Sequence, residues 1–509
     1  MATQEKEILA TAENESTTDL AGLSPEQVLR FYRTMVTSRR VDDREISLKR
    51  QNKIFFQISG AGHEAIGVAV AEHCKSAHDW FFLYYRDRAM TLALGQTPLD
   101  HLLQAVGAEA DPASGGRQMP AHYGDVRYNI ASTSSPTGTQ FLQAVGAAEA
   151  GTKIAGVDGV RELIDRFEDD EVVIVTTGDG TTSEGEFWES LNSACNLNLP
   201  VVYVVEDNGY AISVPVAVQT AGGSISKLVS GFPGLHILEC DGTDVVEAYR
   251  TAGEAIAYAR ERKGPALIHA HCTRPYSHSM SDDERTYRTE EERAVQEVRD
   301  PLTRTRSLLI ENGIASEEEL DTLEASITDE VAQAADDALK SPQPDPSTAL
   351  QHLFSEDVDP TSDDFDTEDD PQYEDDKLLT MVDLLNACMA SEMERDPRIV
   401  VFGEDVADVS KPAALGEVKG KGGVFKVTHG LQAKFGAERV YNSPLAEANI
   451  VGRAIGQALR GMNPIVEIQF FDYIWPAFHQ IRNELATMRY RSNGTFAAPL
   501  VIRTTYGGY

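Results

Sequence analysis

The chain has 509 residues, of which 41% are hydrophobic and 25% are charged, enough for two or three α/β domains with cores of their own. Lys and Arg total 45 against 81 Asp and Glu, and the net charge of −36 excludes nucleic acid and anionic lipid as expected partners. No apolar run approaches the roughly 18 residues of a membrane span, and no basic region precedes an apolar one at the start, so we expect a cytoplasmic protein.

The elements predicted before residue 356 alternate in type. In chain order, the sequence predicts a strand, a helix, a strand, a helix and a strand at Glu171–Thr176, Glu184–Leu197, Val201–Val205, Asp244–Arg262 and Ala266–Ala270. Such alternation of buried strands with helices indicates a parallel, doubly wound sheet. The predicted fold class is therefore α/β.

An acidic segment divides the chain. Glu356–Asp376 holds 12 acidic residues and two prolines but no Lys or Arg, which is the composition of a linker. The sequence after it predicts three more buried strands and two helices, at Ile399–Phe402, Pro464–Phe470, Leu500–Thr504, Ala448–Leu459 and Trp475–Arg491. We therefore expect two doubly wound α/β domains, at residues 1–355 and 377–509, joined by a linker at residues 356–376.

Polar residues follow two neighbouring predicted strands. Gly178-Asp179-Gly180 comes just after the first strand, and Asn208 follows the next strand, 29 residues beyond Asp179. Parallel neighbours deliver their carboxyl ends to one edge of a sheet, where α/β folds bind ligands. Asp179, Asn208 and a backbone carbonyl would offer the oxygen ligands that Mg²⁺ prefers. Gly-Asp-Gly by itself usually marks a turn, so both interpretations stay open from these residues alone.

The longer stretch around these residues is more specific. It reads GDGTTSEGEFWESLNSACNLNLPVVYVVEDNGYAIS and resembles the thiamine diphosphate signature of the 2-oxo acid dehydrogenase family. The resemblance implies a thiamine diphosphate-binding fold in which Mg²⁺ is bound by Asp179, Asn208 and the carbonyl of Tyr210. It also implies that the diphosphate lies against Gly178, Gly180 and Thr181. Asp207 stands where relatives often carry a second Asn.

Two upstream segments also match this family. Tyr85 and Arg86 follow the apolar WFFLY run, and an Arg there suits a bidentate contact with phosphate, although a surface ion pair is the alternative. The resemblance places a Tyr-Arg pair here, with Arg86 on the diphosphate. Within Met119–Ala150 it implies cofactor-adjacent or monovalent-cation (K⁺) positions at Ser134, Ser135, Pro136, Thr139 and Gln140. Thr137 departs from the bulkier aliphatic residue that relatives carry beneath the cofactor.

The second part supplies a candidate for activating the cofactor. Thiamine catalysis requires a buried carboxylate beside the pyrimidine ring, and Glu447 lies just ahead of a predicted helix. An acidic residue favoured by the helix dipole is the alternative interpretation. The surrounding YNSPLAEAN and EIQFFDYIWPAFHQIRNELATMRYRSNG resemble the family's β half, which implies Glu447 as the activating residue and places Leu445, Gln469 and Tyr473 against the pyrimidine. Because the family's cofactor bridges two subunits, we expect a homodimer of fused chains.

A histidine lies on a polar loop after the strand Ala266–Ala270. His278, in YSHSMSDD, would titrate near pH 7 and suits acid–base catalysis, while a solvated loop histidine is the alternative. The family carries a catalytic His at this point of a similar loop. Ser279 and Ser281 correspond to a loop that is phosphorylated in some relatives.

The combined resemblance implies the decarboxylating component of a 2-oxo acid dehydrogenase complex, which transfers its acyl product to a lipoyl arm of an acyltransferase core. The segments KIFFQISG and QFFDYIWPAF favour a branched-chain 2-oxo acid, and pyruvate (or acetoin) is the alternative. A transketolase-like transferase would share the metal signature but not the later segments. The family's β half continues beyond the point matched by Tyr509 with a second catalytic His and another domain. We therefore expect an incomplete β half, and a cofactor-binding module without turnover is a further alternative.

Overall fold

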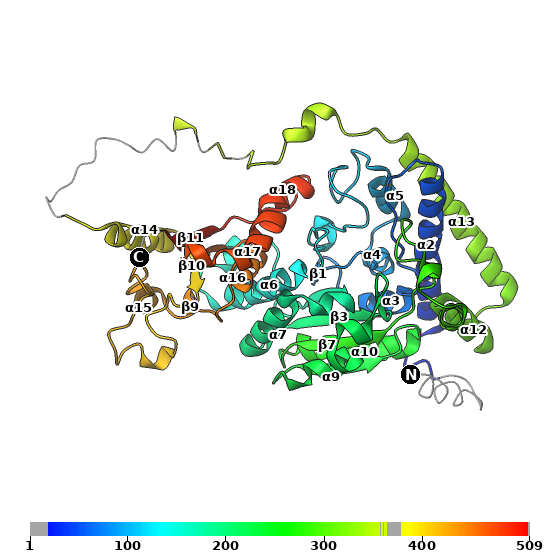
Figure 1. Cartoon of the computed structure of the whole chain (residues 1–509), viewed down its shortest axis with the longest axis horizontal. Coiled ribbons are helices and arrows are strands. Elements are labelled where there is room, and N and C mark those ends of the chain that lie inside the picture. The colour runs from blue at the N-terminus through cyan, green and yellow to red at the C-terminus, as the bar shows by residue number, and fades with distance from the viewer. Residues whose placement is uncertain (1–18, 357, 360, 364–377, 507–509) are drawn as a thin grey trace.

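The computed structural model describes residues 19–356, 358–359, 361–363 and 378–506 (Figure 1). Most of the predicted linker, Glu356–Asp376, lies outside these residues. The helices that flank it, α13 (Glu317–Lys340) and α14 (Met381–Arg395), lie at opposite ends of the molecule (Figure 1).

The N-terminal half is built on a five-stranded sheet in which every pairing is parallel, with the order β1-β2-β3-β7-β6. Its strands are β1 (Trp80–Phe82), β2 (Val173–Gly178), β3 (Val201–Asp207), β7 (Ala266–His271) and β6 (His236–Cys240). A hairpin of β4 (Tyr210–Ala211) and β5 (Val214–Pro215) follows β3. The predicted parallel sheet is confirmed, and β6 is a strand that the sequence analysis did not identify.

Helices cover both faces of this sheet. Side chains alternate along β2, so that Ile174 packs with α3 (Glu64–His73) and α10 (Val245–Arg260) in one core. Val173 and Val175 pack on the other face with α6 (Thr139–Gly156) and α7 (Gly185–Leu197). Burial on both faces explains why β2 and β3 begin with uninterrupted apolar runs, Val173–Val175 and Val201–Val205, rather than alternating patterns.

A third core lies beside the sheet, between α2 (Pro25–Arg50) and α13. Helix α2 begins with a capping box, in which the Ser24 hydroxyl accepts from the Gln27 backbone amide and the Gln27 side-chain oxygen accepts from the Ser24 backbone amide. The remaining helices of this half are α4 (Arg88–Leu94), α5 (Pro98–Val106), α8 (Val216–Gln219), α9 (Ile225–Leu228), α11 (Glu290–Val298) and α12 (Pro301–Glu311).

The C-terminal half holds a second parallel sheet, of four strands in the order β11-β10-β8-β9. The strands are β8 (Ile399–Gly403), β9 (Val440–Asn442), β10 (Asn463–Phe470) and β11 (Val501–Thr505). Its helices are α14, α15 (Leu431–Phe435), α16 (Glu447–Leu459), α17 (Trp475–His479) and α18 (Met488–Arg491).

The predicted helix over Trp475–Arg491 is helical throughout, but it is not one regular α-helix. After α17 the chain forms a π-helical turn at Gln480–Glu484 and a 3₁₀ turn at Leu485–Thr487 before α18 begins. The buried Arg491 side chain donates to the carbonyls of Asn483 and Glu484, at 3.0 and 3.2 Å. The guanidinium thus satisfies carbonyl groups where the regular helix breaks, which periodicity alone does not reveal.

The two halves share a closely packed helix pair, α6 and α16. A Cβ on Gly146 would lie 2.1 Å from the Arg453 carbonyl oxygen, and one on Gly456 would lie 1.9 Å from the Gln143 carbonyl oxygen. Only glycine permits such an approach of two backbones. Beside it, buried Arg453 pairs with buried Glu149 across the interface at 2.6 Å. The halves therefore form one packed unit (Figure 1).

Among the described helices, none combines the length and the apolar character that crossing a membrane requires.

Candidate active site

The carboxyl ends of β2 and β3 bring the first predicted residues together. These strands are hydrogen-bonded neighbours, with Gly178 opposite Glu206, so that Asp179 and Asn208 follow at the same edge of the sheet. Both side chains are buried. Only glycine fits at position 180, because a Cβ there would lie 2.4 Å from the Cβ of Ala211. This edge of the sheet is therefore a compact polar site inside the protein.

The backbone amides of Asp179 and Asn208 and the charge of Arg274 compensate the buried Asp179 carboxylate only in part. Its Oδ2 is buried and has no hydrogen-bond partner among the described residues. Burial, and then the negative charge of Asp207, raise the pKa of Asp179 to about 7. An unpaired buried carboxylate is costly, and a divalent cation would remove that cost. The carboxylate thus fits the predicted metal.

A buried histidine orients Asn208. His63, just ahead of α3, contacts Glu206 through Nδ1 and the Asn208 amide nitrogen through Nε2, at 3.2 Å. Burial, with the charges of Arg86 and Arg274, holds the pKa of His63 well below its usual value, so the ring is neutral. Its Nε2 then accepts from the Asn208 amide, which leaves the Asn208 carbonyl oxygen for the amide of Tyr210 or for an ion. Sequence analysis missed His63, whose only signal is a polar residue opening an apolar helix.

Two buried guanidinium groups lie near these residues. Arg86 donates to the Tyr84 hydroxyl and the Ser59 carbonyl, and its Nη2 lies 3.2 Å from His278 Nδ1. Arg274 donates to the Ile212 carbonyl and the Tyr287 hydroxyl, while its Nε has no partner. Within the described ranges, neither forms an ion pair with a carboxylate. Two buried cations without anions suit an anionic ligand such as a diphosphate.

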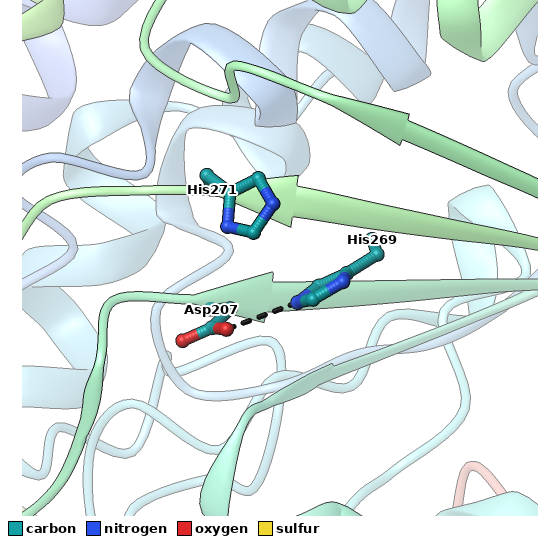
Figure 2. Close-up of side chains that lie close together, drawn as sticks. All are labelled: Asp207, His269 and His271. Carbon is teal, nitrogen blue, oxygen red and sulfur yellow. Dashed lines mark hydrogen bonds and ion pairs between the residues drawn. The ribbon is translucent and has the colours of Figure 1, made fainter. Parts of the chain in front are cut away.

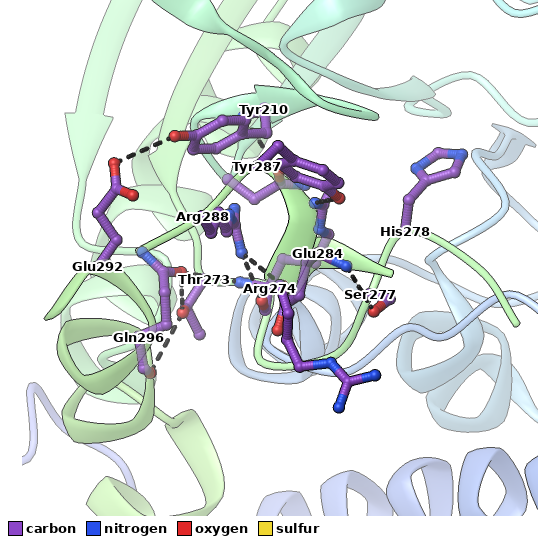
Figure 3. Close-up of polar contacts among 12 residues, drawn as sticks. Tyr210, Thr273, Arg274, Ser277, His278, Glu284, Tyr287, Arg288, Glu292 and Gln296 are labelled. Carbon is purple, nitrogen blue, oxygen red and sulfur yellow. Dashed lines mark hydrogen bonds and ion pairs between the residues drawn. The ribbon is translucent and has the colours of Figure 1, made fainter. Parts of the chain in front are cut away.

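Arg274 was missed by the sequence analysis. It lies three residues after β7, and its position just beyond a strand was the one available signal. Figure 3 shows the polar contacts of this loop, in which Arg288 pairs with Glu284 at 3.1 Å and donates to the Arg274 carbonyl. Arg288 also lies over the Tyr210 ring, 4.3 Å from its centroid. Arg288 therefore contacts both the Arg274 backbone and the Tyr210 ring.

The His278 ring lies to one side of that network (Figure 3), and its backbone joins the network through Asp282, which also accepts from the Tyr287 hydroxyl. Its amide donates to Asp282, and its ring contacts Tyr85 edge-on, with centroids 6.2 Å apart. Burial, followed by the positive charges of Arg86 and Arg274, lowers the pKa of His278 to about 4. The ring is thus a neutral hydrogen-bonding group at pH 7 and does not titrate near neutrality as the sequence analysis expected.

The predicted monovalent-cation residues surround the start of α6. Gln140 accepts from the Gly138 amide at 2.9 Å, and Thr139 donates to the Pro136 carbonyl at 3.1 Å. Ser134 and Thr137 line a small cavity with Gln140, whereas Ser135 is exposed. The Ser134 hydroxyl bonds to Glu484 of the C-terminal half. These side chains are therefore grouped at the junction of the two halves.

The predicted pyrimidine residues form a separate group on the C-terminal half. Glu447 begins α16, Gln469 lies in β10, and Leu445 and Tyr473 are exposed by 68% and 46%. In the part of the chain that the structure describes, no hydrogen bond or ion pair joins Glu447 to the diphosphate-side residues. Its charge instead contributes to raising the pKa of Glu189, which burial and Glu186 bring to about 7.

Two comparisons with known proteins agree with this architecture. The family model "Dehydrogenase E1 component" matches residues 32–347, and "Transketolase, pyrimidine binding domain" matches residues 377–508. Together they define a two-domain thiamine diphosphate fold, which confirms the predicted fold class. Within that class, the chain belongs to the dehydrogenase E1 component family.

Proteins similar to this chain include dehydrogenase α subunits from bacteria and from human mitochondria. The chain is 36% identical over 335 residues to the 2-oxoisovalerate dehydrogenase subunit alpha of Bacillus subtilis, covering 66% of this chain and 97% of that one. It is 35% identical over 321 residues to the 3-methyl-2-oxobutanoate dehydrogenase subunit alpha of Mycobacterium tuberculosis, covering 62% and 80%. The human mitochondrial 2-oxoisovalerate dehydrogenase subunit alpha is 31% identical over 335 residues, covering 66% and 72%.

Proposed function

We propose that the chain catalyses thiamine diphosphate-dependent oxidative decarboxylation of a branched-chain 2-oxo acid and passes the acyl group to a lipoyl group of an acyltransferase core. The observation that carries the proposal is the unbalanced charge at the sheet edge. A buried carboxylate with one unpartnered oxygen, Oδ2 of Asp179, lies near two buried guanidinium groups that form no ion pair with a described carboxylate, Arg86 and Arg274. A divalent cation with a diphosphate would complement both.

The residues present fit Mg²⁺ and thiamine diphosphate. Asp179, Asn208 and the Tyr210 carbonyl would hold the metal, while Arg86 and the amides of Gly180 and Thr181 would hold the diphosphate. Thiamine diphosphate supplies, when bound, an electron sink for the loss of carbon dioxide from a 2-oxo acid. A K⁺ ion bound by Ser134, Thr139 and Gln140 would brace the start of α6, next to Thr181.

The chain's own groups then have distinct tasks. Glu447 would hydrogen-bond the pyrimidine ring, with Leu445, Gln469 and Tyr473 around it. The positive charges of Arg86 and Arg274 would attract the carboxylate of a 2-oxo acid. His278, neutral at pH 7, would accept a hydrogen bond or a proton from the reacting group.

A homodimer would complete the site. Leu445 and Tyr473 are exposed in the single chain, and Phe471, Trp475 and Phe478 near Tyr473 are exposed as well. We propose that a second chain covers this apolar surface and that the cofactor lies between the chains. Light scattering of the purified chain tests this; a monomer that binds the cofactor at full stoichiometry would contradict it.

The relatives' names support a branched-chain substrate, because they include 2-oxoisovalerate and 3-methyl-2-oxobutanoate dehydrogenases. The test is carbon dioxide release from 3-methyl-2-oxobutanoate and from pyruvate, with Mg²⁺, thiamine diphosphate and an artificial electron acceptor. Faster release from the branched acid is expected. Faster release from pyruvate would select the alternative dehydrogenase. Cofactor binding without release from either acid would identify a catalytically incomplete module.

A further inference from the structure

A second group of metal-ligating side chains lies beside the candidate active site, at the carboxyl ends of β3 and β7 (Figure 2). Asp207 ends β3 and is paired in register with His271 of β7, while His269 lies two residues earlier on β7. Paired residues of parallel neighbours, and residues two apart on one strand, point to the same face. The sheet therefore gathers one carboxylate and two imidazoles on one face.

The three side chains are already close enough to share an ion. One ligand atom from each lies within 4.8 Å of the others, and Asp207 Oδ2 is 3.0 Å from His269 Nε2. Asp207 and His269 are buried, and His271 is half-exposed. The group is thus preformed on its inner side and open to solvent at His271.

We propose that Asp207, His269 and His271 bind a divalent transition-metal ion of the zinc class, at a site distinct from the one formed by Asp179 and Asn208. Two imidazole nitrogens with one carboxylate oxygen suit zinc, cobalt or nickel, whereas magnesium prefers oxygen ligands alone. The neighbouring oxygen site and this nitrogen-rich site therefore select different metals.

The Asp207–His269 pair requires little movement, and the His271 side chain would close the remaining distance from its place within 4.8 Å of both. Zinc bonds of about 2.0–2.1 Å place tetrahedral ligand atoms about 3.3 Å apart, so the contact between Asp207 and His269 must open by only about 0.3 Å. The Ser226 amide lies 3.4 Å from His269 Nδ1 and makes that nitrogen an acceptor. The proton of the ring is then on Nε2, and the ion would replace this proton between His269 and Asp207.

A second carboxylate, that of Glu239, contacts His271, the half-exposed member of the group. Glu239, paired in register with His269 from β6, lies on the same face, and its Oε1 is 2.6 Å from His271 Nε2. Its Oε2 accepts from the Ser226 hydroxyl at 3.0 Å. Carboxylates in contact with ligating imidazoles fix the ring and raise its basicity. Glu239 therefore acts as a positioning residue for His271.

The experiment is a zinc titration of the full chain by calorimetry, after chelation and in excess Mg²⁺ and thiamine diphosphate so that the oxygen site is filled. One zinc ion per chain is expected. His271→Ala should weaken binding by about 100-fold or more and Glu239→Gln by about 10-fold, since outer-shell losses cost 10–100-fold. Both side chains are largely at the surface, so these variants should fold. His236→Ala removes another surface histidine, on β6, and should leave binding unchanged.

Cobalt substitution distinguishes the ligands. Visible bands of a cobalt ion with nitrogen and oxygen ligands, lost in His271→Ala, would support the site. Thiolate-to-cobalt bands would assign the binding to a cysteine such as exposed Cys388 and overturn the proposal. Absence of zinc binding, or equal affinity in the wild type and His271→Ala, would also overturn it, leaving the contact between Asp207 and His269 as an ordinary hydrogen bond.

Discussion

Replacing Asp179 by Asn should stabilise the cofactor-free protein while destroying its metal site. The carboxyl has an ordinary pKa of 3.8 and a pKa of about 7 in the folded protein, chiefly because it is buried. At about 1.4 kcal/mol per tenfold change in proton affinity, ionising Asp179 in the folded chain costs about 4 kcal/mol of unfolding free energy. The amide keeps the shape of the side chain and removes the charge.

The sign of the pH dependence follows from the raised pKa. The Asp179 carboxyl binds its proton more tightly in the folded state than in the unfolded state. The stability that the protonated Asp179 gives the folded chain is therefore intact below pH 3.8 and is lost as the pH rises through 7. The free energy gained by Asp179→Asn should therefore approach about 4 kcal/mol at pH 8 and be less than half of that at pH 5. Urea unfolding of the metal-free chain at both pH values measures the gain.

A matched control is Asp169→Asn, because Asp169 is exposed and paired with Arg161, and that hydrogen bond lowers its pKa. No gain is expected from it at either pH. Adding Mg²⁺ and thiamine diphosphate should reverse the order, stabilising the wild type but not Asp179→Asn. A gain of the same size at pH 5 and pH 8 would refute the electrostatic reasoning, as would unchanged Mg²⁺ affinity in the variant.

Three further substitutions test the catalytic half and the junction. Glu447→Gln should abolish decarboxylation yet leave Mg²⁺ and thiamine diphosphate binding intact; turnover at the wild-type rate would reject the assigned role. Arg453→Met leaves the Glu149 carboxylate buried without its partner and should cost about 3–5 kcal/mol in calorimetric unfolding, most of which adding Glu149→Gln should restore. Gly456→Ala should lower the melting temperature, because the new methyl group would collide with the Gln143 carbonyl oxygen. The control Gly185→Ala places its methyl group in open space and should leave the melting temperature unchanged. Equal effects of the two substitutions would argue against close packing of α6 and α16.

The strands were predictable because burial on both faces leaves apolar runs that stand out in the sequence. The run at Val201–Val205 is strand β3, which extends to Asp207, and Ala266–Ala270 is β7 with one residue more. The placement of Asp179 beside Asn208 followed from strand adjacency alone. Such inferences depend on periodicity and on the rule that parallel neighbours end at one edge.

Long-range pairing was not predictable in the same way. His63 and Arg274 contact partners more than 60 residues away, such as Asn208 and Ile212, and the local signal at each residue does not identify these partners. The change from an α-helix to a π-helical turn after His479 is accompanied by a side chain from the end of the same segment, Arg491, which donates to the carbonyls of Asn483 and Glu484. The apolar periodicity of the segment does not reveal this change of helical type.

The close contact of α6 with α16 limits how this architecture can be recombined. Helix α6 starts beside Thr181 of the diphosphate side, and α16 starts at Glu447 of the pyrimidine side. Their spacing is set where backbone meets backbone, at Gly146 and Gly456. Suppose that the N-terminal half were joined to the C-terminal half of another protein. The first residues of α6 and α16 would keep their relative positions only if both helices came from the same parent protein. The unit of modular exchange is therefore the helix pair, and the boundary for chimaeras does not coincide with the acidic linker.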